Sequence, residues 1–455
     1  MTDAVAHRRA EAYVAAVNAS DEAPAEAFRT RHTNPAYAAS VPREVFIDFF
    51  AQQRRVTGGL ELEDVRVVSP RRAEALLRDR IYGARHGLTL DFDDTAEALV
   101  SEFDPDPAPL WAPPAPRDRT TAQIATDALA LVRRGCEAQV FSGAVLVARG
   151  RTVLATEACG YANRRYDVPN RPDTRFNLAS INKMFTAVAV MQLAEAGKLS
   201  LDDPLSRHLD ETWIAPDVGR TITLRHLLTH TSGLGSFLNE TWNRSSRRLY
   251  SDLGDYKPLV RDERPAFAPG SAFQYSNTGM LLLGAVIEKV SGESYFDYVR
   301  DHVFAPSGMS SAGYLAMNEP VPNLAMGYGP APGSPYGWRE NTPNQLFRGT
   351  PAGGGYATVE DLHRFAVALQ EGRLVSDASR AVLWRDNAPN DYGGGFTVET
   401  TAAGKVVGHD GIFSGVSTRF RIYLDSGYVV VILGNQDFAA PGLDEALTEL
   451  IARGR

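Results

Sequence analysis

The sequence predicts an α+β fold in two parts that are joined by a proline-rich linker. Residues 1–104 combine helical periodicity with strand-like runs. Residues 105–118 hold a dense series of prolines, which is typical of a stiff, extended linker. In residues 119–455 the middle third reads as helix and loop, and strand-like runs gather toward the end. We therefore expect a small α+β domain followed by a larger domain of helices and sheet.

The first part shows helices and then an antiparallel meander. Apolar residues recur at helical spacing over Ala4–Val17 and Pro42–Arg55. Short turns separate the strand-like runs Leu60–Val68, Ala73–Ile81, His86–Phe92 and Ala98–Phe103. Helices followed by such a meander resemble the cystatin-like cone fold of the nuclear-transport-factor and SnoaL type.

Cone folds of this kind sometimes carry a pocket with His and Asp inside, and His86, Asp91 and Asp93 are the candidates here. The alternative is that these side chains belong to a solvated strand face. We favour this alternative, because a fold alone does not establish a function. The first domain is then expected to serve packing or self-association into a homo-oligomer.

Composition and charge exclude several classes of partner. Of the 455 residues, 44% are hydrophobic and 22% are charged, as is usual for a globular protein. The net charge of −8 gives no reason to expect nucleic acid or an anionic membrane as a partner. The start of the chain is charged, and no apolar run is long enough for a signal segment or a membrane span. We expect a cytoplasmic protein.

The two cysteines, Cys136 and Cys159, suggest neither a metal site nor a disulfide framework. We expect both to be small, buried hydrophobic residues. The sequence predicts neither a metal nor an organic cofactor.

A serine and a lysine at helical spacing are the most informative feature of the chain. Ser180 and Lys183 lie in Asn177-Leu-Ala-Ser-Ile-Asn-Lys-Met-Phe, and the apolar residues that follow recur at helical spacing up to Gly197. Residues i and i+3 share a helix face, so we expect the Lys183 amine beside the Ser180 hydroxyl. The amine can accept the hydroxyl proton, and the helix N-terminus favours developing negative charge. An N-cap serine with a solvated lysine is the alternative.

Two further motifs follow downstream. Tyr275-Ser-Asn277 precedes the apolar helical run Met280–Val290. His409-Asp-Gly411 opens a strand-rich end with the runs Ser417–Tyr423 and Tyr428–Leu433. Serine β-lactamases and penicillin-binding proteins carry S-x-x-K, then Y-x-N or S-D-N, then K-T-G in the same order.

The stretch from Thr120 to the end therefore resembles the class C β-lactamase-related serine hydrolases, which include the family VIII carboxylesterases. Three more segments are similar to this family: Phe141–Leu154, Leu227–Leu234 and Pro351–Leu362. The resemblance implies an antiparallel sheet flanked by helices, with a helical lobe alongside and Ser180 in the cleft between them. The full expectation is a serine β-lactamase-like domain preceded by a small α+β cone-like domain.

The same resemblance implies the roles of the motif residues. Ser180 would form an acyl-enzyme, and Lys183 would take or relay its proton, which requires a depressed pKa. Tyr275, as a phenolate held between cations, would act as general base and then as acid toward the leaving group. Asn277 would hydrogen-bond Lys183 and the substrate.

The resemblance also implies an oxyanion hole made by the backbone N–H groups of Ser180 and Ile412. Gly411 would let its strand approach the substrate closely. His230, in the Leu227–Leu234 segment, is expected to be structural.

The third motif departs from the β-lactamase pattern, because His409-Asp410 stand where Lys-Thr would grip a substrate carboxylate. A histidine is mostly neutral at pH 7, and Asp410 would repel an anionic group. The esterase-like members of the family also lack K-T-G. The sequence thus predicts a carboxylesterase-like hydrolase of small, neutral esters or amides.

The alternatives are a D-aminopeptidase, a D-Ala-D-Ala carboxypeptidase, an acyltransferase or a β-lactamase of the same fold. A different class of alternative is a non-catalytic protein that uses the fold to bind an acyl ligand.

Overall fold

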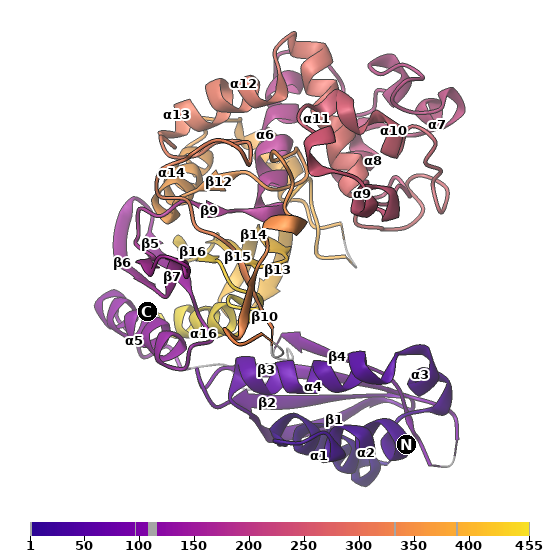
Figure 1. The fold of residues 1–455 in the computed structure, drawn as a ribbon, viewed down its shortest axis with the longest axis vertical. Coiled ribbons are helices and arrows are strands. Elements are labelled where there is room, and N and C mark those ends of the chain that lie inside the picture. The colour runs from indigo at the N-terminus through magenta and orange to yellow at the C-terminus, as the bar shows by residue number, and fades with distance from the viewer. Residues whose placement is uncertain (1, 96, 108–115, 332–333, 388–389, 455) are drawn as a thin grey trace. The chain divides into compact units, whose positions relative to one another are not determined.

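The computed structural model describes residues 2–95, 97–107, 116–331, 334–387 and 390–454 (Figure 1). The chain divides into two compact units. The first unit consists of Met1–Phe141 with Thr401–Ala403 and Phe438–Arg455, and the second of Ser142–Thr400 with Gly404–Asp437. Most of the expected linker, residues 108–115, lies outside the described residues.

The first unit contains the expected helices and antiparallel meander. Its sheet follows the chain in the order β1-β2-β3-β4, with β1 (Leu60–Ser69), β2 (Arg72–Asp79), β3 (Arg85–Phe92) and β4 (Val100–Pro107). The helices before it are α1 (Asp3–Asn18), α2 (Ala23–Ala27), the π-turn η1 (Phe28–His32), α3 (Pro35–Ser40) and α4 (Arg43–Thr57). The last strand runs past the expected end at Phe103 into the prolines, which an edge strand tolerates because its outer N–H groups need no partner.

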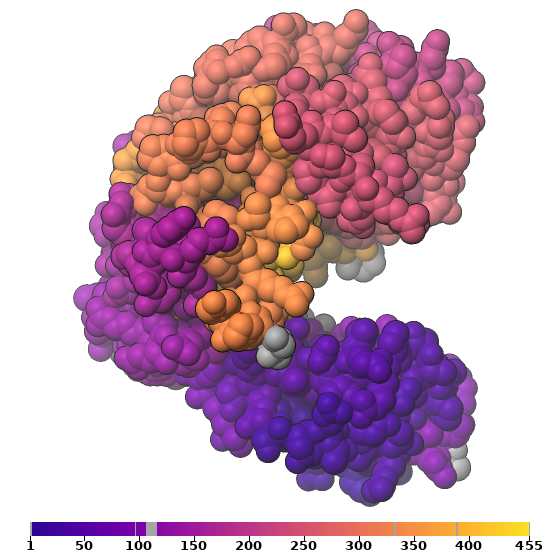
Figure 2. Space-filling model, in the orientation of Figure 1, coloured from indigo at the N-terminus to yellow at the C-terminus, as the bar shows by residue number. Residues whose placement is uncertain are grey.

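An aromatic core fills this domain. The Phe103 ring centroid lies 5.6 Å from that of Tyr13, 5.7 Å from that of Phe28 and 5.9 Å from that of Phe50. The Tyr13 and Phe28 rings meet Phe103 edge to face, which aromatic quadrupoles favour. Figure 2 shows the domain, in indigo and violet, as a compact body on the face in view.

The polar candidates of this domain make local structural contacts. His86 Nε2 lies 2.9 Å from Asp79 Oδ2, and the Arg72 guanidinium donates to both oxygens of Asp91 at 2.7 Å. Asp93 accepts backbone N–H groups of the loop that follows it. These contacts favour the solvated-face interpretation over a pocket.

The first unit also holds two helices from the hydrolase-like part of the sequence, α5 (Thr121–Glu137) and α16 (Pro441–Ala452). Helix α16 was not predicted from the sequence, whose last residues were expected to form strands. Tyr82 lies against both helices: a Cβ on Gly135 would come within 2.4 Å of its hydroxyl, and one on Gly442 within 3.1 Å of its ring. An ion pair of 2.9 Å between Arg85 and Glu449 adds to this contact.

The beginning and the end of the hydrolase-like stretch are tied together. Arg119 N–H donates to the Arg453 carbonyl at 2.9 Å. The Arg453 guanidinium in turn donates to both oxygens of Asp118, at 3.0 and 2.9 Å. The charge of Arg453 lowers the pKa of Asp118 through these hydrogen bonds.

The second unit is built on a six-stranded sheet whose strands come from both ends of the unit, in the order β13-β14-β15-β16-β5-β6. They are β5 (Gly143–Arg149), β6 (Thr152–Cys159), β13 (Thr397–Thr401), β14 (Gly404–Phe413), β15 (Val416–Tyr423) and β16 (Tyr428–Gly434). The early hairpin joins the late strands where β16 pairs antiparallel with β5, with Gly434 opposite Gly143. A Cβ on Gly143 would lie 2.1 Å from the Leu433 carbonyl oxygen, so this pairing requires glycine. The α+β fold with an antiparallel sheet is confirmed.

Helices and short strands complete the second unit (Figure 1). The helices are α6 (Asn182–Glu195), α7 (Pro216–Thr221), α8 (Leu224–Leu228), α9 (Glu240–Arg244), α10 (Lys257–Val260), α11 (Asn277–Ser291), α12 (Tyr295–Val299), α13 (Ala305–Ser307), α14 (Val359–Gln370) and α15 (Asp377–Leu383). The short strand pairs are β7 (Tyr161–Asn163) with β8 (Val168–Pro169), β9 (Phe176–Asn177) with β12 (Tyr356–Ala357), and β10 (Tyr328–Pro330) with β11 (Trp338–Glu340). Helix α6 is buried on all sides over most of its length, as expected for a central helix of the fold.

The expectation for the cysteines is wrong. Cys136 and Cys159 are both disulfide-bonded, and neither is a free thiol. Disulfides persist mainly in oxidising compartments, so this finding weighs against the expected cytoplasmic location. Spacing along the chain could not reveal this state, because disulfide formation depends on the three-dimensional placement of a cysteine.

Candidate active site

Ser180 lies in a strained turn that the backbone places in front of helix α6. It is the middle residue of the 3₁₀ turn η2 (Ala179–Ile181), which follows β9 and leads into α6. Ala179 has a φ of 45°, a left-handed conformation that costs energy for a residue other than glycine. Ser180 itself is only partly buried, so its hydroxyl is accessible beside a sparsely populated backbone conformation.

Two neighbouring segments contact this turn: the glycine-rich stretch at Gly354 and Gly355, and strand β14. The Gly354 N–H donates to the Ala179 carbonyl at 3.2 Å, and the Leu178 N–H donates to the Gly355 carbonyl at 2.8 Å. On the other side, a Cβ on Gly411 would lie 2.3 Å from the Leu178 carbonyl oxygen. The glycine at 411 is therefore required for the approach of β14 to the serine turn, and not only for the approach to a substrate.

Lys183 is fully buried and reaches Ser180 from one turn into the helix. Its Nζ lies 2.9 Å from Ser180 Oγ, 2.9 Å from Asn277 Oδ1 and 2.6 Å from the Ala352 carbonyl oxygen. No carboxylate of the described residues lies within ion-pair distance of it. Burial lowers the pKa of this amine well below its ordinary value.

Tyr275 is hydrogen-bonded to Ser180, and Lys183 Nζ lies 4.7 Å from the centroid of its ring. Burial raises the pKa of Tyr275 well above the ordinary tyrosine value, and the hydrogen bond with Ser180 offsets part of the shift. The residue still exposes 39% of its surface, so water moderates this effect. This direction favours the phenol in the free site, and the expected role of Tyr275 as a phenolate base stays a prediction.

Asn277 begins helix α11 and connects Lys183 to a neighbouring loop. Its Oδ1 accepts from Lys183, and its Nδ2 donates to Ser236 Oγ at 3.0 Å. The amide is thereby held in one orientation, because Lys183 offers it only a donor. Ser276 caps the helix by accepting the Gly279 N–H at 2.8 Å.

His409 is buried and does not face the cavity as a free donor. Its Nε2 is 3.0 Å from the Tyr392 hydroxyl, and its Nδ1 is 2.7 Å from the Asp410 carbonyl oxygen. Burial, followed by the charge of Lys183, lowers the pKa of His409 to about 3. A neutral His409 agrees with the sequence expectation.

Asp410 forms ion pairs with two arginines of the neighbouring strand, and its expected repulsion of a bound anion stays a prediction. Successive residues of a strand face opposite sides, and Asp410 shares its face with Arg419 and Arg421 of β15. Arg421 Nη1 lies 2.7 Å and Arg419 Nε 3.3 Å from Asp410 Oδ1; these are ion pairs by distance, although poorly aligned for hydrogen bonds. Burial raises the pKa of Asp410, but the charges of Arg421 and Arg419 outweigh it and the pKa is lowered.

The cavity in front of Ser180 is small and mostly apolar, with a volume of about 60 Å³. Both expected oxyanion residues, Ser180 and Ile412, belong to its wall. Its other lining residues are Asn177, Ala179, Phe237, Leu238, Asn277, Leu346, Thr350, Ala352, Gly353, Gly354 and Phe413. The structure thus gathers Ser180, Lys183, Tyr275, Asn277 and Ile412, and leaves the His409 and Asp410 side chains outside the lining.

Similarity to known proteins agrees with this arrangement. The family described as Beta-lactamase matches residues 117–453. The chain belongs to the beta-lactamase family. The PbpX protein of Bacillus subtilis (strain 168), named for penicillin binding, is 33% identical over 301 residues, which is 64% of this chain and 70% of that protein. Esterase EstB of Burkholderia gladioli is 37% identical over 191 residues, 40% of this chain and 48% of the esterase.

Among solved structures, a penicillin-binding protein from Bacillus halodurans matches with a TM-score of 0.63 and 33% identity. The match covers 69% of this chain and 96% of that one. Together with the family match and the esterase relative, it makes this chain a serine hydrolase of the β-lactamase and penicillin-binding-protein fold.

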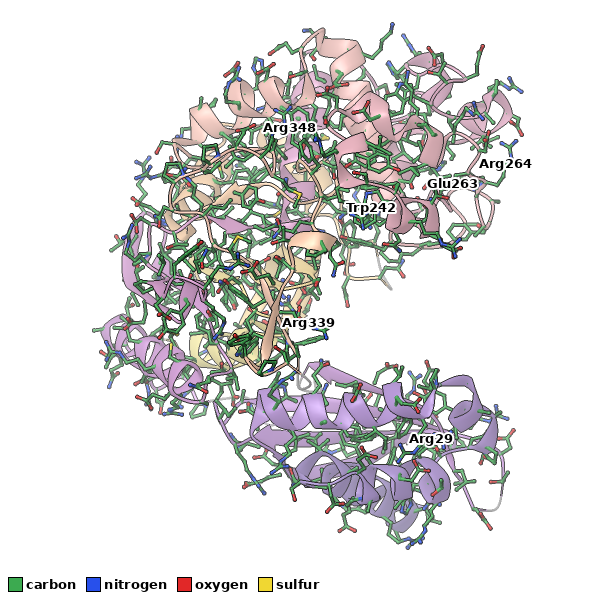
Figure 3. All side chains as sticks on the ribbon, in the orientation of Figure 1. Arg29, Trp242, Glu263, Arg264, Arg339 and Arg348 are labelled. Atoms are coloured by element: carbon green, nitrogen blue, oxygen red, sulfur yellow. The ribbon has the colours of Figure 1, made fainter. Side chains whose placement is uncertain are left out.

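Sequence reasoning missed several residues of this family member's site. The Ala352 carbonyl accepts from Lys183, but the Pro351–Leu362 segment gave only a family likeness and no role. Glu263, labelled in Figure 3, accepts the Gly235 N–H and so braces the loop that carries Ser236 and Phe237. Burial raises the pKa of Glu263. Nothing in the sequence around Tyr392 pointed to its contact with His409.

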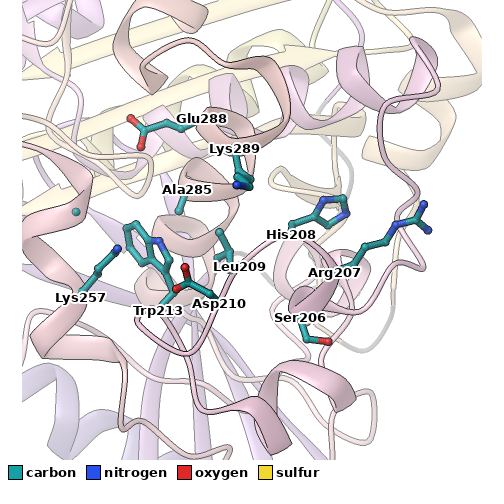
Figure 4. A pocket seen from close by; sticks show the side chains of 11 residues that line it. Ser206, Arg207, His208, Leu209, Asp210, Trp213, Lys257, Ala285, Glu288 and Lys289 are labelled. Atoms are coloured by element: carbon teal, nitrogen blue, oxygen red, sulfur yellow. The ribbon is translucent and has the colours of Figure 1, made fainter.

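A second pocket of about 530 Å³ lies in the helical lobe, away from Ser180 (Figure 4). In this view Lys257, Trp213 and Asp210 line one side, and His208 and Arg207 the other. Its lining residues are Ser206, Arg207, His208, Leu209, Asp210, Trp213, Gly254, Lys257, Ala285, Glu288 and Lys289.

Two properties of the described residues bear on other functions. No three His, Cys, Asp or Glu residues of the described ranges gather as a metal site would require. No helix in the described part of the chain has the length and apolar character needed to cross a membrane.

Proposed function

We propose that the chain is a carboxylesterase-like hydrolase that cleaves small, neutral esters, and amides less well, through an acyl-enzyme on Ser180. One observation carries the proposal: Lys183 is buried without an opposite charge and makes one of its three hydrogen bonds to Ser180 Oγ. A buried amine of this kind with a nucleophile in reach is typical of an active site rather than of a structural ion pair.

The contacts of Lys183 suit a neutral amine. Ala352 and Asn277 offer it acceptor oxygens, which take its two N–H groups. In the structure Lys183 Nζ donates to Ser180 Oγ at 2.9 Å. A neutral amine would accept the Ser180 proton with its lone pair along this same contact. Lys183 is therefore the base that removes the Ser180 proton as Oγ bonds to the acyl carbon.

The carbonyl oxygen becomes negatively charged during this attack. The Ser180 and Ile412 N–H groups at the cavity wall would stabilise it, by the match to the family's oxyanion hole. When the acyl–oxygen bond breaks, the Tyr275 phenol gives its proton to the leaving alkoxide. The phenolate that results lies near the newly formed Lys183 ammonium.

Water completes the cycle with the same two groups. The Tyr275 phenolate takes a proton from water, whose oxygen bonds to the acyl carbon. Lys183 returns its proton to Ser180 Oγ as the acyl bond breaks, so the enzyme is restored and the acid is released. Tyr275 is thus an acid in acylation and a base in deacylation.

The substrate class follows from the cavity and from the third motif. Phe237, Leu238, Leu346 and Phe413 give the cavity apolar walls suited to a short acyl chain. His409 has both ring nitrogens engaged and presents no cation to a substrate carboxylate. Esterase EstB, a relative named for ester hydrolysis, adds support.

A panel of p-nitrophenyl esters, nitrocefin and D-amino-acid amides tests the proposal. We expect the shortest esters to give the highest kcat/KM. A fluorophosphonate probe should label the wild-type chain at Ser180, whereas a non-catalytic acyl-binding protein would take up no label. Labelling at another residue, or nitrocefin turnover that matches the best ester, would contradict the proposal.

A further inference from the structure

A buried chain of hydrogen bonds runs behind the proposed acid Tyr275. His230 Nε2 lies 3.1 Å from the Tyr392 hydroxyl, and the same hydroxyl lies 3.0 Å from His409 Nε2. All three side chains are almost fully buried. They come from the loop after α8, from the stretch before β13 and from β14, so the chain joins distant segments.

Backbone groups at both ends of this series of hydrogen bonds determine which atom is the donor in each of them. The Ser276 N–H donates to His230 Nδ1 at 3.2 Å, so that nitrogen carries no proton and Nε2–H must donate to Tyr392. At the other end, the Asp410 carbonyl is only an acceptor, so His409 Nδ1 carries the proton. The Tyr392 hydroxyl then accepts from His230 and donates to His409 Nε2.

This pattern allows only neutral imidazoles. A proton on His409 Nε2 would confront the Tyr392 oxygen, which already faces the His230 N–H. The Tyr392 hydrogen would then have no acceptor in the chain, and an unsatisfied buried hydroxyl is unfavourable. The charged groups near His409 act in both senses: Lys183 and Arg421 disfavour its protonation, and Asp410 favours it.

The three rings also form the wall against which Tyr275 rests. The Tyr275 ring centroid is 4.5 Å from that of His230 and 6.2 Å from those of Tyr392 and His409. On another side Lys183 Nζ approaches the same ring. The orientation of the Tyr275 hydroxyl toward Ser180 therefore depends on this wall.

We propose that Tyr392 is a positioning residue of the hydrolase: by bridging neutral His230 and His409 it holds the wall behind Tyr275 and keeps His409 uncharged. The inference rests on the proposed function, because it assigns Tyr392 to the support of that reaction. It also explains why His409 cannot replace the lysine of K-T-G.

The tautomers can be read directly from the wild-type protein. With ¹⁵N-labelled histidine, NMR near neutral pH should show His409 protonated at Nδ1 and His230 protonated at Nε2. The chain has nine histidines, and signals are assigned by their loss in single His→Gln variants. A wild-type His409 that is charged, or protonated at Nε2, overturns the inference whatever the activity of the protein.

Tyr392→Phe tests the bridge itself, because it removes the hydroxyl and keeps the ring. Loss of a neutral hydrogen bond of this kind should lower kcat on a neutral ester about three- to tenfold, with KM little changed. The His409 ring should also titrate at a higher pH than in the wild type, since its neutral form loses a donor. A variant with unchanged kcat and unchanged His409 signals contradicts the proposal.

Tyr328→Phe is the matched control. Its hydroxyl is also buried and accepts the Arg164 N–H at 2.8 Å, but it lies in β10, outside the Ser180 cavity. We expect this variant to keep the wild-type kcat and His409 titration. Activity that survives Ser180→Ala would overturn the proposed function, whereas the NMR result judges the Tyr392 bridge separately.

Discussion

The titratable groups of the first domain and those around Ser180 differ in how their charge is compensated. Asp91 forms an ion pair with Arg72, and His86 Nε2 is hydrogen-bonded to Asp79. Lys183 is buried and is surrounded by neutral oxygens instead. An ion-paired group contributes to the stability of a fold and has little reactivity. A buried amine without a counter-charge, in contrast, can change its protonation state and react. The first domain and the hydrolase site are thus distinguished by compensation rather than by residue type.

The largest effect should come from removing Ser180, the proposed nucleophile beside the buried Lys183 amine. Ser180→Ala should lower kcat on the best ester by about 10⁴-fold or more, as for nucleophiles that act as part of a unit. Steady-state kinetics measures the loss, and Ser310→Ala, an exposed serine in the same unit, serves as the control. Substantial activity in Ser180→Ala would show that Ser180 is not the nucleophile, and that the buried Lys183 amine does not mark the reactive site.

The next effect tests whether Lys183 and Tyr275 share one proton path. Lys183→Ala and Tyr275→Phe should each cost about 10²- to 10⁴-fold in kcat. The double variant should lose little more than the worse single variant, because both act in the same steps. If the two losses multiply, the groups work independently and the mechanism is wrong.

Substrate charge should have an intermediate effect. Without a cation from the third motif, a carboxylate substrate forgoes a charge-assisted hydrogen bond, which is worth about 1.5–3 kcal/mol or roughly ten- to hundredfold. We expect neutral short-chain esters to exceed benzylpenicillin and peptides that end in free D-Ala in kcat/KM by at least this factor. Equal efficiency would direct attention to another cation in the cleft.

Replacing Lys183 should raise the thermal stability of the protein, although it lowers the activity. In the folded chain the amine is neutral above its lowered pKa, while the unfolded chain binds a proton up to the ordinary lysine value. Within that window the unfolded state holds more protons, so stability rises with pH. Lys183→Met should therefore unfold at a higher temperature than the wild type at about pH 6, with the gap closing toward about pH 10. Calorimetry at several pH values measures both; a lower melting temperature throughout would show that the hydrogen bonds outweigh the cost of burial.

The smallest effect should come from the compensated groups of the first domain. His86→Gln and Asp91→Asn should leave kcat and KM for the best ester within about twofold of the wild type. Any loss should appear as reduced thermal stability instead. A selective loss of kcat would show that the first domain takes part in the reaction.

The sequence predicted the reactive cluster because helical spacing and motif order are local properties. Ser180 and Lys183 are one turn apart, and Asn277 begins a helix whose apolar pattern is evident, so their convergence needed only the family likeness. The face of Asp410 was also predictable, since neighbours on a strand point to opposite sides. The effect of Asp410 on a charged substrate stays a prediction.

Other parts of the site could not be predicted from local pattern. The Ala352 carbonyl carries no residue-specific signal, since any residue could supply it. Tyr392 acquires its role only when two distant histidines meet it in the fold. The state of Tyr275 depends on burial, which a motif does not report. The homo-oligomer and the cone-like identity of the first domain stay predictions.

The meeting of Arg119 with Arg453 has a consequence for how this fold can be rearranged. The stretch that matches the family spans residues 117–453 and begins and ends at the same place, held by a backbone hydrogen bond and the Asp118 pair. A chain with such adjacent ends tolerates a change of starting point, because joining the old ends requires only a short connection. The reaction then does not require the present order of segments along the chain. A circular permutant opened at the Gly150 turn of the β5–β6 hairpin would move α5 and β5 to the end of the chain, behind β16 and α16, while assembling the same cavity.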